Sequence, residues 1–120
     1  MNTHMSVTIY HNPRCSKSRQ TLALLKERGI DADVVLYLDN PPDATALSDV
    51  LEKLDISALE LMRAGEDDYK RCHDKVAVMS NAEQIIWLIA HPKVIQRPIV
   101  VTVKGARIGR PPESVLEILD

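Results

Sequence analysis

The sequence is short of the side chains on which several protein classes depend. Its 120 residues contain no Phe, one Trp and two Cys. A core must therefore come mostly from Leu, Ile and Val, and two cysteines are too few for the disulfide framework of a small secreted domain. The longest apolar runs, such as residues 85–90, are too short to span a bilayer. With no signal peptide evident at the start, we expect a cytoplasmic protein with free thiols and no membrane segment.

The charge of the chain argues against a further class. A formal net charge of −2 is unlike that of a protein that binds nucleic acid through bulk positive charge. The length fits one domain, which we expect over residues 1–120, with residues 1–5 a disordered or tag-derived start. Acidic residues are missing from two separate stretches, 6–26 and 84–112, which both carry Lys and Arg. These basic stretches either converge on one anion site or form two solvated surfaces.

Hydrophobic patterning predicts an α/β fold. A short β-rich run, a helix over residues 18–29 and a second run form a βαβ unit with parallel strands. Near the end, two runs joined at Lys104-Gly105 form an antiparallel hairpin, followed by a helix over 111–119. The four expected strands are residues 7–10, 34–38, 98–103 and 106–109. The result is a mixed four-stranded sheet with a helical insertion between the βαβ and ββα halves.

The insertion carries helix-start signals. Asp43 is a suitable N-cap, and Ser57 with Glu60 fits a capping box. A second capping box is formed by Ser80 and Glu83, before the apolar run at 84–90. The middle of the chain is therefore expected to be helical, with no repeat and no linker.

One segment, HNPRCSKSR at residues 11–19, concentrates reactive chemistry around Cys15. Three cations lie beside it in sequence: Arg14, Lys17 and Arg19. Cys15 stands where a strand passes through a loop into a helix, and positive charge together with a helix N-terminus favours a thiolate. A protonated His11 would add to this effect, and Ser18, about one turn on, can offer its hydroxyl to the sulfur. A cysteine that merely lies near a helix start is the alternative, but this charge favours a nucleophile.

Three common cysteine motifs do not fit the spacing. A dithiol motif C-x-x-C would need a cysteine where Ser18 stands, and the phosphatase-type loop C-x5-R would need an arginine where Thr21 stands. A zinc site lacks its usual paired ligands, so we expect no metal. The second thiol that regenerates Cys15 should therefore come from outside the protein, unless Cys72 folds onto it.

Three arginines are candidates for binding an anion. Arg97 and Arg110 each stand directly before a proline on either side of the expected hairpin, and Arg63 lies in LMRAGE. Taken singly, each is more often a solvated surface charge.

Taken together, HNPRCSKSR, LMRAGE, RPIVV and ARIGRPPE resemble the arsenate reductases of the glutaredoxin-dependent class, the ArsC family, and especially its short bacterial members. The resemblance covers nearly the whole chain and implies a thioredoxin-like fold. It makes Cys15 the nucleophile that attacks arsenate. The other residues it implies are His11 and Ser18 as stabilisers of the thiolate, Arg63, Arg97 and Arg110 around the oxyanion, and Pro98 as a cis-proline.

The resemblance also implies the reaction partners. Arsenate would form an adduct with the Cys15 thiolate, glutathione would act as co-substrate, and glutaredoxin would complete the reduction to arsenite, with no bound cofactor. Cys72 has no role in the family pattern. The wider fold group also includes redox-sensing regulators that bind RNA polymerase. A regulator or interaction protein with Cys15 as sensor therefore stays open as the second hypothesis.

Overall fold

The computed structural model describes residues 6–119. The expected disordered or tag-derived start at residues 1–5 lies outside this range. The chain divides into two compact units, one that joins Met1–Tyr37 to Arg97–Asp120 and one that comprises Leu38–Gln96. The second unit is thus inserted in the sequence of the first, as expected for a helical insertion, while the expectation of one domain over 1–120 stays a prediction. Within the described range, no helix is long and apolar enough to cross a membrane.

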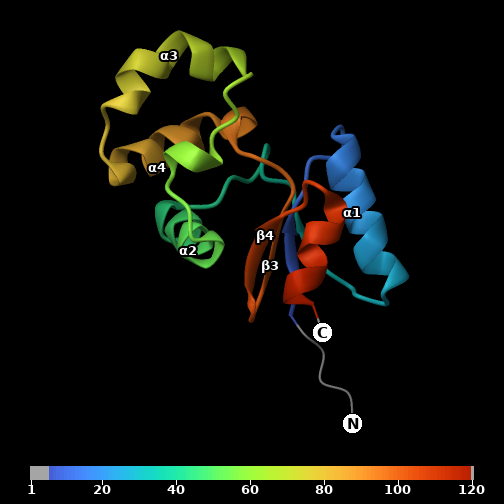
Figure 1. Cartoon of the computed structure of the whole chain (residues 1–120). Coiled ribbons are helices and arrows are strands. Elements are labelled where there is room, and N and C mark those ends of the chain that lie inside the picture. The colour runs from blue at the N-terminus through green and yellow to red at the C-terminus, as the bar shows by residue number, and fades with distance from the viewer. Residues whose placement is uncertain (1–5, 120) are drawn as a thin grey trace. The chain divides into compact units, whose positions relative to one another are not determined.

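The first unit is built on a mixed four-stranded sheet (Figure 1). Its strands are β1 (Thr8–Tyr10), β2 (Asp33–Val35), β3 (Ile99–Thr102) and β4 (Gly105–Ile108), in the order β2-β1-β3-β4. β1 pairs in parallel with β2, while β3 is antiparallel to both β1 and β4. The predicted α/β class and mixed sheet are confirmed.

The bounds of all four strands differ from the prediction, by one residue at each changed end except the end of β2, which comes three residues earlier. The second strand ends at Val35 instead of residue 38, because its partner β1 ends at Tyr10, which is paired with Val35. β2 lies at the edge of the sheet, and its Val34 side chain is 45% exposed. The hairpin turn falls at Val103-Lys104, one residue earlier than expected, and Gly105 opens β4 with a φ of 144°, which favours glycine.

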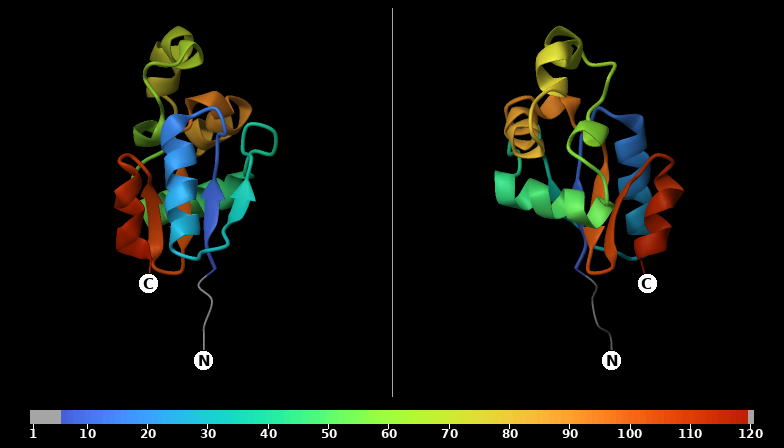
Figure 2. Two further views of the ribbon diagram at one scale, coloured as in Figure 1. Left: turned by 90° about the vertical axis from the view of Figure 1, so that its right-hand side faces the viewer. Right: turned by 60° about the vertical axis from the view of Figure 1, so that its left-hand side comes forward.

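The core of this unit lies under two helical elements. α1 (Ser16–Glu27) and the 3₁₀ helix η3 (Pro112–Ile118) lie side by side (Figures 1 and 2). Their buried side chains join those of the sheet in one cluster: Val7, Ile9, Leu25, Val100, Val115, Ile118 and Leu119. Burial of each such aliphatic side chain contributes about 1.5–3 kcal/mol, so this cluster stabilises the packing of α1 and η3 on the sheet.

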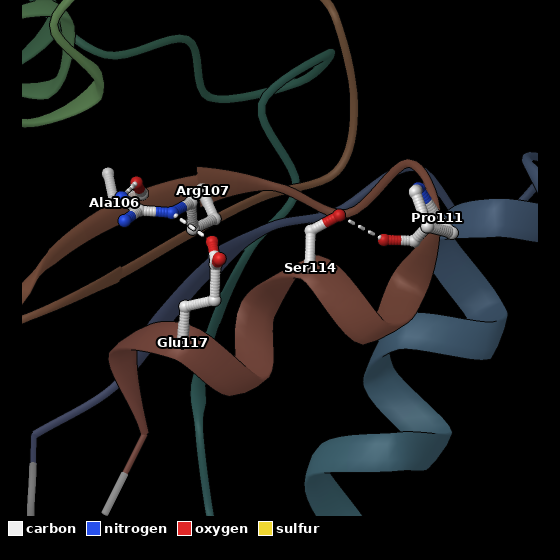
Figure 3. Close-up of polar contacts among 5 residues, drawn as sticks. All are labelled: Ala106, Arg107, Pro111, Ser114 and Glu117. Carbon is white, nitrogen blue, oxygen red and sulfur yellow. Dashed lines mark hydrogen bonds and ion pairs between the residues drawn. The ribbon is translucent and has the colours of Figure 1, made fainter.

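The C-terminal helix is a 3₁₀ helix, whose N–H groups bond to carbonyls three residues back, as Ser114 does to Pro111. The two prolines at its start, Pro111 and Pro112, have no N–H to donate. Figure 3 shows how side chains support it: the Ser114 hydroxyl donates to the Pro111 carbonyl, and Arg107 of β4 forms an ion pair with Glu117 at 2.8 Å.

The second unit is helical. Its elements are α2 (Ala44–Leu54), η1 (Leu59–Leu61), α3 (Asp67–Ala77), α4 (Asn81–Ala90) and η2 (Pro92–Val94). Asp43 caps α2 by accepting from Ala46 N–H at 2.8 Å, and the Ser80–Glu83 capping box of α4 is present, so both predictions are confirmed. Ser57 and Glu60 also bond reciprocally, but they open only a single 3₁₀ turn.

Candidate active site

Cys15 occupies the N-cap position of α1, where the chain leaves β1 through a short loop. Its backbone is extended (φ −95°, ψ 123°), its side chain is half-buried, and its carbonyl accepts from Arg19 N–H at 3.0 Å. The N–H groups of residues 16–18 form the first turn of the helix, where no carbonyl inside the helix can accept from them. Together with the helix dipole, they favour negative charge beside Cys15.

Asn12 fixes the loop that carries Cys15. Its carbonyl accepts from Cys15 N–H, its Oδ1 accepts from Arg14 N–H, and its own N–H donates to Ser18 Oγ, each at 3.0 Å. Asn12 was not among the candidate site residues predicted from the sequence. An Asn-Pro pair after a strand is a turn signal, and it is the signal that points to this residue.

His11 and Ser18 form a buried pair. His11 Nδ1 lies 2.6 Å from Ser18 Oγ, and Ser18 is fully buried. Burial, followed by the positive charges of Lys26 and Arg19, lowers the pKa of His11 below its ordinary value of 6.5. His11 is therefore neutral at pH 7, so it acts through its hydrogen bond to Ser18 and not as the extra cation that a protonated imidazole would supply.

The sheet register brings two of the three arginines to the end of the strands where Cys15 lies. Ile99 pairs with both Tyr10 and Ile108, so the segments that follow β1, precede β3 and follow β4 all leave the sheet at the same end of the strands. These segments carry Cys15, Arg97 and Arg110. An anion held by Cys15 would therefore lie at the same end of the sheet as the segments that carry these two arginines.

At this end of the strands, Arg97 and Arg110 are in contact with each other. Arg110 Nη1 lies 3.5 Å from the Arg97 carbonyl, and Arg97 Nε is buried without a hydrogen-bond partner among residues 6–119. The peptide bond before Pro98 is cis. The bond before Pro111 is also cis, although only Pro98 was expected to be a cis-proline.

Gly109 is a second residue that the sequence analysis did not single out. Its N–H donates to the Pro98 carbonyl at 2.9 Å, and a Cβ at this position would lie 2.5 Å from Thr21 Oγ1 and 2.8 Å from Pro98 Cγ. Only glycine allows the end of β4 to approach α1 this closely.

Arg63 and Cys72 belong to the second unit. Arg63 follows η1, where its N–H donates to the Val94 carbonyl at 2.6 Å, and its side chain pairs with Glu66. Cys72 lies on α3, and both cysteines of the chain are free thiols. Among residues 6–119, no group of His, Cys, Asp and Glu side chains is arranged to hold a metal ion.

These features place the protein among α/β proteins with a cysteine presented at a helix start. Comparison with known proteins is more specific. A sequence model of the ArsC family matches residues 10–118, and the chain belongs to this family.

Three relatives illustrate the match. The chain is 54% identical over 114 residues to the uncharacterized protein YfgD of Escherichia coli K12, covering 94% of this chain and 96% of YfgD. It is 45% identical over 116 residues to an arsenate reductase of Haemophilus influenzae, covering 96% and 100%. Its structure is similar to that of an arsenate reductase from Vibrio cholerae, with a TM-score of 0.92, 45% identity and coverage of 98% and 100%. The fold is thioredoxin-like, as the resemblance implied.

Proposed function

We propose that the protein is an arsenate reductase that reduces arsenate to arsenite at Cys15. The observation that carries the proposal is the position of Cys15 at the N-cap of α1. The segments that carry Arg97 and Arg110 leave the sheet at the same end of the strands as the segment that carries Cys15. The family membership and the arsenate reductases among its relatives support the same activity. The protein is thus an oxidoreductase whose reactive group is a thiol.

Arginine side chains and helix N–H groups hold the oxyanion in this proposal. Arg97 and Arg110 bind it with charge-assisted hydrogen bonds. The family resemblance assigns the same role to Arg63. The buried Nε of Arg97, without a partner among the described residues, supports such a role, because a buried unpaired donor costs about 1–3 kcal/mol. An oxyanion oxygen that accepted from this group would recover that cost.

The reaction requires two electrons, and two thiols supply them. The Cys15 thiolate attacks arsenic, forming an S–As bond while an As–O bond breaks and the oxygen leaves as water. Glutathione then attacks the adduct. When the S–S bond forms between its sulfur and Cys15, the electron pair of the S–As bond stays on arsenic, which leaves as arsenite.

Glutaredoxin then reduces the disulfide between Cys15 and glutathione. Ser18 stands where a C-x-x-C motif would carry a resolving cysteine, which favours this external source of thiols. Both cysteines of the chain are free, which suits a reducing compartment such as the cytoplasm.

His11 and Ser18 keep Cys15 reactive. Ser18 occupies the third position of α1, the position whose side chain reaches back to the N-cap residue in a capping box. Its hydroxyl is held by Asn12 N–H and by His11. In this arrangement His11 and Asn12 fix the Ser18 hydroxyl, which in turn stabilises the thiolate.

Arsenate-dependent oxidation of NADPH, coupled through glutathione reductase, glutathione and glutaredoxin, tests the proposal. We expect turnover by the wild type and by Cys72→Ser, and none by Cys15→Ser. Turnover that survives in Cys15→Ser would show that the nucleophile is another residue. A silent wild type whose Cys15 is still alkylated by iodoacetamide would instead favour a redox regulator.

A further inference from the structure

Two exposed arginines beside Cys15 have no carboxylate partner in the protein. Arg14 and Arg19 form no ion pair among residues 6–119, and the stretch 6–26 contains no Asp or Glu. Arginines that do pair with a carboxylate lie elsewhere in the chain: Arg63, Arg71 and Arg107. The positive charge around Cys15 is therefore available to an anion from solution.

The side chain of Arg19 lies against the loop that carries Cys15. Arg19 belongs to the first turn of α1, and its Nη1 reaches back to the Pro13 carbonyl, to which it donates at 2.9 Å. A neutral carbonyl takes one of the five N–H donors of a guanidinium group and none of its charge. The other donors of Arg19 can therefore bind a carboxylate beside this loop.

Arg14 stands directly before Cys15 in a tight turn. Cys15 N–H donates to the Asn12 carbonyl, so Pro13 and Arg14 are the central residues of the turn, and Arg14 N–H donates to Asn12 Oδ1. The side chain of Arg14 is exposed and makes no hydrogen bond or ion pair with residues 6–119. A fixed backbone thus presents a solvated guanidinium group next to Cys15.

We propose that Arg14 and Arg19 bind the carboxylates of the thiol that frees Cys15. The reductant is then an anionic thiol, the class to which glutathione belongs. The proposal rests on the proposed role of Cys15 as a nucleophile that an external thiol regenerates. That thiol must bring its sulfur to Cys15, and these two arginines belong to the turn and the helix start that hold Cys15. Arg97 and Arg110 come from the segments around β3 and β4, so each pair of arginines binds a different reactant.

The chain offers a matched control on the same helix. Arg28 is the C-cap residue of α1, is exposed, and also forms no ion pair among the described residues. The 12 residues of α1 separate it from Cys15. They span about 18 Å, which is beyond the Debye length of about 8 Å at physiological ionic strength. Arg28→Gln removes the same charge and reports the effect of net charge alone.

The first experiment follows disulfide exchange at Cys15 without arsenate, in a Cys72→Ser background. The Cys15 thiolate attacks one sulfur of the disulfide and forms a new S–S bond with it, and the other half leaves as a thiolate. The rate with oxidised glutathione is divided by the rate with neutral bis(2-hydroxyethyl) disulfide, which cancels any change in the reactivity of the thiolate. We expect this ratio to fall about threefold in Arg14→Gln and in Arg19→Gln, and about tenfold in the double variant. Arg28→Gln, and Arg19→Lys, which keeps the charge, should stay within about 1.5-fold of the wild type.

Arsenate turnover at varied glutathione, with glutaredoxin in excess, gives the second readout. In the double variant the KM for glutathione should rise about tenfold, while the KM for arsenate changes less than twofold. An equal rise in both would mean that these arginines attract any anion, and it overturns the proposal.

The two readouts separate this inference from the proposed function. An exchange ratio that does not move in the double variant, in a protein that still reduces arsenate, overturns only the role of Arg14 and Arg19. A ratio that falls as expected, in a protein whose wild type does not reduce arsenate, supports the anionic-thiol site and overturns the proposed arsenate reduction.

Discussion

Two helices of this protein begin in contrasting ways. At the start of α4, Ser80 Oγ accepts from Glu83 N–H at 3.2 Å, and Ser80 N–H donates to Glu83 Oε1 at 2.9 Å. At the start of α1, Cys15 takes the same N-cap position, but its side chain accepts no hydrogen bond from the N–H groups of residues 16–18.

The residue at the third helical position also differs. In α4 it is Glu83, which turns back to its own N-cap residue, whereas in α1 it is Ser18, whose hydroxyl is bonded to His11 and to Asn12 N–H. The start of α4 satisfies its own N–H donors and serves stability. At the start of α1 no side chain of the N-cap residue accepts from these donors, as a site that binds anions requires.

The largest effect is expected where β4 holds α1 in place. In Gly109→Ala, the new Cβ would lie 2.5 Å from Thr21 Oγ1, which donates to the Lys17 carbonyl in the first turn of α1. We expect the free energy of unfolding in urea to fall by about 1–3 kcal/mol, as for other overpacked sites.

Gly65→Ala is the matched control for this substitution. No described atom lies within 4 Å of a Cβ built at Gly65, so we expect no loss of stability there. Equal losses in the two variants would show that the close approach at Gly109 does not position α1.

Alanine at each N-cap tests the comparison directly. Ser80→Ala removes an acceptor from the start of α4 and should lower the free energy of unfolding by about 1 kcal/mol. Cys15→Ala removes no capping bond and should change it by about 0.5 kcal/mol or less. Urea unfolding of both variants measures the difference. If Cys15→Ala costs as much as Ser80→Ala, the sulfur supports the helix, and the contrast between the two starts is lost.

The sequence predicted the framework of the fold because that framework follows from local signals. Asp43 and the Ser80–Glu83 pair mark helix starts through bonds that span only three residues. α3 was not singled out, because Val76 is its only buried residue among those described, and a helix without an apolar stripe leaves no hydrophobic period to detect. The end of β2 was missed for another reason: it depends on where its partner β1 ends.

The candidate site divides in the same way. Cys15 was identified from the charges and the helix start beside it, all within residues 11–19. That Arg97 and Arg110 lie at the same end of the sheet follows from strand register, which a sequence alone leaves open. The three bonds of Asn12 are local, and the Asn-Pro turn signal could have pointed to them. The contact of Gly109 with Thr21 and Pro98 joins residues whose relative positions only the folded chain defines.

The smallest effect expected is a difference in pH dependence between the two helix starts. Burial lowers the pKa of His11 below 6.5, so below that pH the unfolded chain binds a proton that the folded protein does not. Its contribution to stability is therefore complete above pH 6.5 and is lost as the pH falls below it. The hydrogen bonds from Ser80 lower the pKa of Glu83 below its ordinary 4.5, so the contribution of Glu83 is present above pH 4.5 and is lost as the pH falls further.

Urea unfolding between pH 8 and pH 3.5 of the wild type, His11→Asn and Glu83→Gln separates the two. His11→Asn should flatten the profile only in the part that starts near pH 6.5, and Glu83→Gln only in the part below pH 4.5. At pH 8 both differences from the wild type should be constant, because neither group titrates there in the folded or the unfolded chain. If His11→Asn keeps the slope that the wild type shows below pH 6.5, His11 is not a buried neutral imidazole in the folded protein. The His11–Ser18 pair would then contain a charged imidazole.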